Sequence, residues 1–271
     1  MKTWTMALFT LKETVRTKTM IAGLVVSFLY LAVTPVLSST SGGGAIVGEM
    51  DKAAASIDFL NFALTGLNFI GIFLAIFTTL GTVYSEVEQG TILTVVTKPL
   101  ERRQIIYGKW LGHSLTMIIY VLLMGVMLWI PAAVDAGAVW SYFPALGLVC
   151  LNVATMVSLT MLFSVFVPVI ANAIFVFIIF ILTANLSVVD IINRMSDNLI
   201  VSIVAAGLRL VLPVSEVTDL AGSLMRTRAA EAAMASNSVL VPRAWSFAYE
   251  IVYMGVLVVL SARIFRKRDL V

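Results

Sequence analysis

The sequence predicts an all-α integral membrane protein, a single transmembrane domain made of six transmembrane helices. Apolar residues make up 60% of the chain and charged residues only 12%, whereas charged residues form about a quarter of a typical soluble domain. The apolar residues come in separate runs of about 20, the length that an α-helix needs to cross a bilayer. One helical bundle is therefore expected to account for residues 1–271.

The first 18 residues predict an amphipathic helix before the first span. Trp4, Leu8, Leu11 and Val15 recur at helical spacing on one face, while charged residues occupy another. A helix of this kind lies in the membrane interface with its basic side towards lipid headgroups, so membrane lipid is an expected partner. The alternative is a plain charged leader.

Six apolar runs predict the transmembrane helices. Pro131 is expected to end the third span, and Pro168 to mark a tight turn between the fourth and the fifth. The segment 190–243 holds only short apolar stretches and predicts re-entrant or helical structure on the outer side. The predicted spans are residues 20–37, 60–83, 110–130, 145–166, 169–189 and 244–264.

Charge asymmetry predicts the side that each loop occupies. If both termini and the loop 84–109 share one side, that side carries 12 of the 18 Lys and Arg residues but 5 of the 15 acids. Cytoplasmic segments are enriched in Lys and Arg. Both termini and this loop are therefore predicted to be cytoplasmic, in a multi-pass protein of the cytoplasmic (inner) membrane. The same clustering explains the net charge of +3 without a nucleic-acid partner.

The chain has no site of its own for a nucleotide. It contains no G-x-x-x-x-G-K-[ST] phosphate-binding loop, and no soluble segment is long enough to form a nucleotide-binding domain. If ATP drives this protein, ATP and Mg bind to a separate subunit, and this chain is expected to hold no cofactor, metal or catalytic residue. The loop 84–109 is then the contact for that subunit.

Residues 85–97 of this loop predict a short helix that lies flat on the membrane. Glu86, Gln89 and Leu93 share the face that would point towards a partner, although Glu88 projects among the apolar positions. The alternative is an ordinary solvated loop.

The loop also carries a recognisable pattern of residues. The string E-V-E-Q-G-T-I at 86–92 is followed by K-P-L at 98–100, by Arg103 and by G-K at 108–109. These residues resemble the cytoplasmic loop of ABC type-2 permeases, the membrane subunits of many bacterial ABC exporters.

This resemblance implies that the helix over 85–97 is the coupling helix, which docks onto a nucleotide-binding ATPase subunit, and that residues 2–18 are an elbow helix. It also implies a homodimer of permeases with two ATPases, and an outer or periplasmic accessory protein is an open further partner. The residues assigned to ATPase docking are Glu86, Glu88, Gln89, Gly90, Thr91, Leu93, Lys98, Pro99 and Arg103.

Polar residues inside the spans are the candidates for a substrate pathway. An ionisable residue in a span is a functional candidate by default, whereas hydrogen bonding between helices explains buried amides equally well. The pathway candidates are Asn68, Asn152, Asn172 and Glu250.

The sequence therefore predicts the permease subunit of an ATP-binding cassette transporter that exports a substrate. One alternative, an ATP-independent secondary transporter, would show internal repeats and intramembrane charges. The other, an intramembrane enzyme, would need paired carboxylates or a Ser/His or His/Glu constellation within the spans. Neither pattern is found in the sequence.

Overall fold

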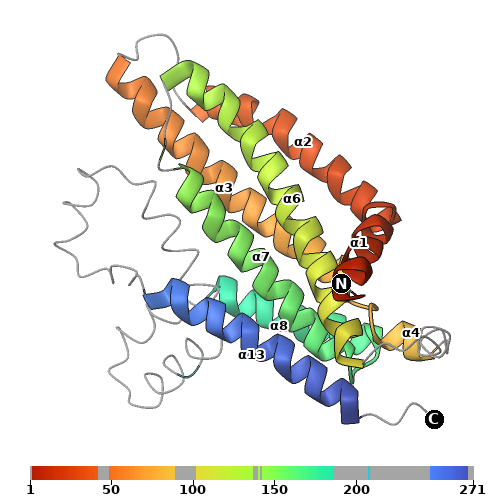
Figure 1. Cartoon of the computed structure of the whole chain (residues 1–271). Coiled ribbons are helices and arrows are strands. Elements are labelled where there is room, and N and C mark those ends of the chain that lie inside the picture. Colours follow the sequence, from red (N-terminus) through yellow and green to blue (C-terminus); the bar gives the residue numbers. More distant parts are fainter. Residues whose placement is uncertain are drawn as a thin grey trace.

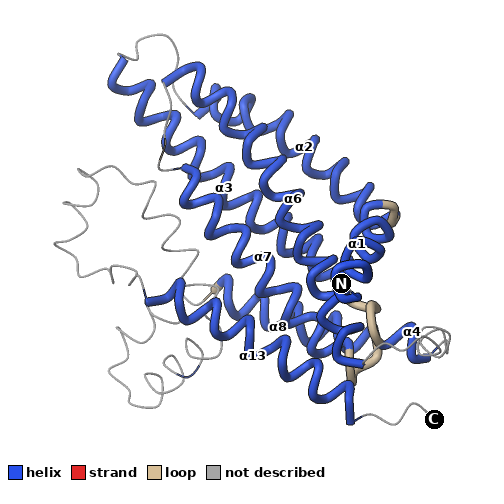
Figure 2. The backbone as a smooth tube through the Cα atoms, in the orientation of Figure 1, coloured by secondary structure: helices blue, strands red, loops and turns tan. Residues whose placement is uncertain are grey.

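The computed structural model describes residues 2–41, 49–88, 102–136, 140, 142–185, 207 and 245–267. All the regular elements in these residues are helices (Figures 1 and 2), which confirms the predicted all-α fold. The helices are α1 (Lys2–Val15), α2 (Lys18–Ser41), α3 (Glu49–Thr79), α4 (Tyr84–Glu88), α6 (Arg102–Ala136), α7 (Tyr142–Ser164), α8 (Val169–Ala184) and α13 (Trp245–Lys267).

Four of the described helices contain segments that are long and apolar enough to cross a membrane. They are Phe59–Thr79, Arg103–Pro131, Tyr142–Ser164 and Phe247–Arg266. The pair α1 and α2, bent by 61°, passes the same test as one unit and gives a fifth candidate, while α8 is a shorter apolar helix. The protein is therefore a multi-pass helical membrane protein, and the count of six spans stays a prediction.

Helix α7 lies at the centre of the bundle. In the apolar segment of α7 that is long enough to cross a membrane, 78% of the residues are buried, whereas in the corresponding segment of α13 the buried share is 28%. Helices α3, α6 and α13 all pack on α7. Its interior hydroxyls bond back to their own helix: the Ser158 hydroxyl donates to the Ala154 carbonyl and the Thr160 hydroxyl to the Met156 carbonyl, each at 2.8 Å. These two hydroxyls are thus satisfied by their own helix inside an apolar core.

Two glycines let α1 pack closely on the first turns of α6. A Cβ added at Gly108 would lie 2.6 Å from the Met6 Cβ, and one at Gly112 would lie 2.7 Å from the Ala7 carbonyl oxygen. Helix backbones approach this closely only where small residues face each other. The spacing of four residues places both glycines on the same side of α6.

The predicted apolar face of α1 points away from the bundle. Trp4, Leu8 and Val15 are exposed, whereas Thr10 and Thr14 are buried against α6. The helix over the first residues is confirmed, although it ends at Val15. Its apolar outer face suits contact with lipid, and its location in the membrane interface stays a prediction.

The predicted boundaries of the third span differ from the structure. Helix α6 begins at Arg102 and not at 110, because long basic side chains are good helix formers and do not interrupt the backbone pattern. The apolar segment of α6 that is long enough to cross a membrane ends at Pro131, where the span is predicted to end, while the helix itself continues to Ala136. A proline removes one backbone hydrogen bond, and here the residues after it keep their helical conformation.

The second predicted span, 60–83, also ends too late. Helix α3 runs from Glu49 and ends at Thr79, and residues 80–83 form a turn. Gly81 lies in this turn, and glycine is a poor helix former. The turn separates α3 from the short helix α4.

The region after the predicted fifth span is only partly described. Helix α8 ends at Ala184, before the predicted 189, and the Asn185 N–H caps it by donating to the Ile181 carbonyl at 3.1 Å. The predicted turn at Pro168, which directly precedes α8, is confirmed. The predicted outer segment 190–243 lies outside the described residues except for Gly207.

The close contact between α1 and α6 predicts that Gly112→Ala lowers the thermal unfolding midpoint in detergent. The new methyl group would overlap the Ala7 carbonyl and the Thr10 side chain, and such overpacking costs about 1–3 kcal/mol. Gly147→Ala on α7 is the control, because a Cβ at Gly147 meets no atom within 4 Å. Equal midpoints for the two variants, measured by circular dichroism, would contradict the packing described.

Candidate functional site

The predicted docking residues lie partly within the structure. Helix α4 contains Glu86 and the exposed Glu88, and Arg103 is exposed in the first turn of α6. The side chain of Glu86 lies outside the described set. The other predicted docking residues also lie outside it: Gln89, Gly90, Thr91, Leu93, Lys98 and Pro99. The structure therefore describes the start of the predicted coupling segment and the turn that leads into it.

This turn, residues 80–83, is called the α3–α4 turn below. The last carbonyls of a helix and the first N–H groups of the next have no partner within their own helix. Other helices supply them here: the Lys109 ammonium of α6 donates to the Thr82 carbonyl at 2.7 Å, and the Val83 N–H donates to the Ser164 hydroxyl of α7 at 3.1 Å. The turn is therefore tied to two further helices.

Helix α8 provides the third connection. The fully buried Asn172 donates its amide to the Leu80 carbonyl at 3.0 Å and to the Thr160 carbonyl of α7 at 3.2 Å. One side chain thus joins α8, α7 and the end of α3. The α3–α4 turn consequently accepts hydrogen bonds from α6 and α8 and donates one to α7.

Two polar side chains of α6 are buried beside this turn. Lys109 and His113 are each 6% exposed and lie one helical turn apart. The His113 Nε2 is 3.1 Å from the Thr82 hydroxyl, and its Nδ1 is 3.3 Å from the Thr14 hydroxyl of α1. The Lys109 ammonium lies at the C-terminal end of α3, where the helix dipole favours a cation.

An apolar cluster beneath the turn brings several helix ends together. Val83, Ile106 of α6, Met161 of α7, Val165 and Phe265 of α13 are all buried in it. The start of α4, the first turns of α6 and the C-terminal end of α13 therefore lie at one end of the bundle, and α1 packs at the same end. This arrangement agrees with the predicted topology, and the side of the membrane that this end faces stays a prediction.

The four predicted pathway residues are not gathered at one place. Asn68 is half-buried on α3, and Asn172 of α8 hydrogen-bonds to the α3–α4 turn. Asn152 of α7 and Glu250 of α13 are fully buried, on two helices that pack together, and the Glu250 carboxyl hydrogen-bonds with Thr155. Whether any of them contacts a substrate stays a prediction.

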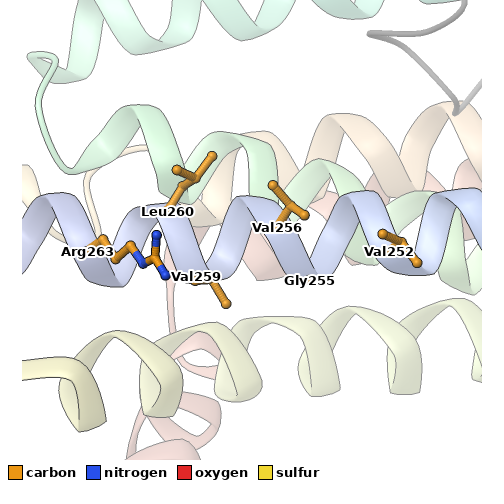
Figure 3. Close-up of a pocket in the computed structure, with 6 residues that line it drawn as sticks. All are labelled: Val252, Gly255, Val256, Val259, Leu260 and Arg263. Atoms are coloured by element: carbon orange, nitrogen blue, oxygen red, sulfur yellow. The ribbon is translucent and has the colours of Figure 1, made fainter.

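A shallow recess lies along the exposed side of α13 (Figure 3). Its lining is apolar apart from one arginine, which suits a surface that meets lipid more than a polar ligand. The lining residues are Val252, Gly255, Val256, Val259, Leu260 and Arg263. Among the residues that the structure describes, no three His, Cys, Asp or Glu side chains are grouped so that they could hold a metal ion.

Sequence reasoning missed the polar contacts around the turn. The G-K pair at 108–109 carried the family resemblance, but the burial of Lys109 and its bond to Thr82 were not expected. The repeat of glycine at 108 and 112 was the one available signal, because such spacing marks a close helix contact. His113 gave no signal, since its partners lie 31 and 99 residues away in the sequence.

These features define a multi-pass α-helical membrane protein whose polar contacts concentrate on a turn at one end of the bundle. A family model described as "ABC-2 family transporter protein" matches residues 4–270, so the chain belongs to the ABC-2 transporter family. It is a permease component of an ABC transporter, a class of membrane subunit that associates with an ATP-binding subunit. A search of curated proteins finds no match.

The contacts of Asn172 predict that Asn172→Leu destabilises the folded protein. Leucine is similar in volume, but it leaves the Leu80 and Thr160 carbonyls without their amide donor, at a cost of about 1–3 kcal/mol. Asn185→Leu is the control, because the exposed Asn185 side-chain amide bonds, within the part of the chain that the structure describes, to a carbonyl of its own helix. Denaturant or thermal unfolding in detergent measures the difference, and equal stability of the two variants would contradict this role.

Proposed function

We propose that this chain is the permease subunit of an ABC exporter in the cytoplasmic membrane, driven by ATP that a separate nucleotide-binding subunit hydrolyses. The family assignment supports a permease, and the absence of a phosphate-binding loop from the sequence supports a separate ATPase. The observation that carries the proposal is the α3–α4 turn, which holds the start of the predicted coupling segment against α6, α7 and α8.

The coupling segment in this proposal comprises residues 85–97 together with the basic residues that follow. Its side chains Glu86, Gln89 and Leu93, which share one predicted helical face, enter a groove of the ATPase subunit. The exposed side chains of Glu88 and Arg103 border this contact and supply charge complementarity at its rim. Both termini lie on the same cytoplasmic side, and the chain crosses the membrane six times.

Transport follows from differential binding. Two permeases and two ATPase subunits form the working complex in this proposal. ATP drives the permeases between conformations only because it binds one conformation of the complex more tightly than the other. Closure of the ATPases displaces the coupling segments, and each displaced segment moves its α3–α4 turn and the helices bonded to it. The two bundles then rock and open a path at their interface.

The docking role predicts that the double variant Glu86→Ala, Gly90→Leu weakens binding of the nucleotide-binding subunit by about tenfold or more, as loss of a central contact does in other interfaces. Glu49→Ala removes a carboxylate at the start of α3, on the predicted outer side, and is the control. Co-purification and titration with the labelled ATPase subunit measure the affinity. If the double variant binds the ATPase subunit as tightly as the wild type does, the assignment of the coupling segment is wrong.

The topology predicts which introduced cysteines react from outside the cell. Cys150 is the only cysteine in the chain and is replaced by alanine as background. Glu49→Cys should react with a membrane-impermeant maleimide on intact cells, whereas Glu13→Cys on α1 should react only after permeabilisation. The reverse labelling pattern would place the end of the bundle that holds α1 outside the cell. It would therefore contradict the proposed cytoplasmic location of the coupling segment.

A further inference from the structure

We infer that His113 is a positioning residue that ties α1 to the α3–α4 turn, so that α1 moves together with the coupling segment. This inference rests on the proposed function and goes beyond it, because it names the contact through which a movement of the ATPase subunit would reach the predicted elbow helix, α1. His113 is the only histidine of the chain. Its ring is buried in α6 and bonds to one hydroxyl on each side.

The hydrogen bonds around this ring form a chain with one direction. The Thr14 hydroxyl donates its proton to the Thr10 carbonyl at 2.8 Å, so its oxygen is left to accept. The His113 Nδ1 must therefore carry the proton that Thr14 accepts. In the neutral ring the Nε2 is then an acceptor, and the Thr82 hydroxyl donates to it.

A neutral ring fits its surroundings better than a charged one. The Lys109 ammonium is buried one helical turn away, and both side chains face Thr82. A second cation buried at this distance from the first would be repelled and would lose its hydration. The resulting chain runs from the Thr82 hydroxyl through the ring to Thr14 and ends on the α1 backbone at Thr10.

The first turns of α6 carry two contacts side by side. Gly108 and Gly112 admit the backbone of α1, and the adjacent Lys109 and His113 bind the α3–α4 turn. Close packing holds α1 on α6, and the imidazole adds a direct bonded link from α1 to the turn. A displacement of the turn is consequently passed to α1 through His113.

The first experiment determines which nitrogen of the His113 ring carries the proton. Because the chain has one histidine, labelling with ¹⁵N-histidine reports His113 alone by NMR. The expected result is a neutral ring protonated at Nδ1, the less common tautomer of a free histidine side chain. Thr14→Val should move the proton to Nε2, since the acceptor at Nδ1 is gone while Thr82 can still accept. A wild-type ring protonated at Nε2, or at both nitrogens, would overturn the inference.

The second experiment measures how His113 affects ATP hydrolysis by the complex with the ATPase subunit. His113→Ala should leave the affinity for that subunit and the KM for ATP unchanged, while kcat for ATP hydrolysis by the complex falls about fivefold or more, the lower end of measured coupling effects. Thr14→Val should act in the same direction, and combining it with His113→Ala should add nothing. His113→Gln, which keeps one donor and one acceptor, should recover part of the rate.

Ser114→Ala is the matched control. Ser114 is the next residue of α6 and is also buried, but within the described residues its hydroxyl has no hydrogen-bond partner, so its kcat should equal that of the wild type. A wild-type kcat in His113→Ala with normal ATPase binding would overturn this inference alone. Failure of the wild-type chain to bind an ATPase subunit would overturn the proposed function and, with it, the transmission.

Discussion

The backbone groups at the end of α3 must find hydrogen-bond partners within an apolar bundle, and this requirement organises one whole end of the protein. Terminal carbonyls of a helix have no partner in their own helix, and Leu80 and Val83 of this turn are buried among side chains, which leaves little access for water. Lys109, Ser164 and Asn172 provide the partners from three different helices. The packing of α6, α7 and α8 around the turn follows from that need.

Lys109 shows why a charge is tolerated at this buried place. Its ammonium binds the Thr82 carbonyl and faces the negative end of the α3 dipole. A neutral donor of the same length would satisfy the carbonyl but would lose the interaction with the dipole. The same helical turns of α6 carry Gly108 and Gly112, so one short stretch both admits α1 and binds the turn. These residues of α6 therefore determine how α1, α6 and the α3–α4 turn lie relative to one another.

The sequence predicts much of the fold but few of the contacts at the α3–α4 turn. Apolar runs are set by the thickness of the membrane, so the helices were placed within a few residues for α7 and α13. Helix α6 is longer than the predicted span 110–130 at both ends, because the helical backbone continues through the basic residues before it and through Pro131. The bonds of His113 and Asn172 join residues far apart in sequence, and hydrophobic periodicity holds no information about such pairs. The docking residues Gln89 and Leu93 rest on the predicted helical face, and Gln89 also on the motif.

A turn bonded on three sides has a mechanical consequence for a transporter. The hydrogen bonds of the turn connect it to α6, α7 and α8, and interiors packed like this shift between discrete arrangements and do not deform smoothly. Helix α7, at the centre, contacts α3, α6 and α13, so a shift at the turn reaches the core of the bundle directly. Helix α13 has the smallest buried share of the four single-helix candidate spans, yet it packs on α6 and α7 and buries Phe265 in the cluster beneath the turn. The contacts of the turn and those of α13 therefore meet at the same end of the bundle.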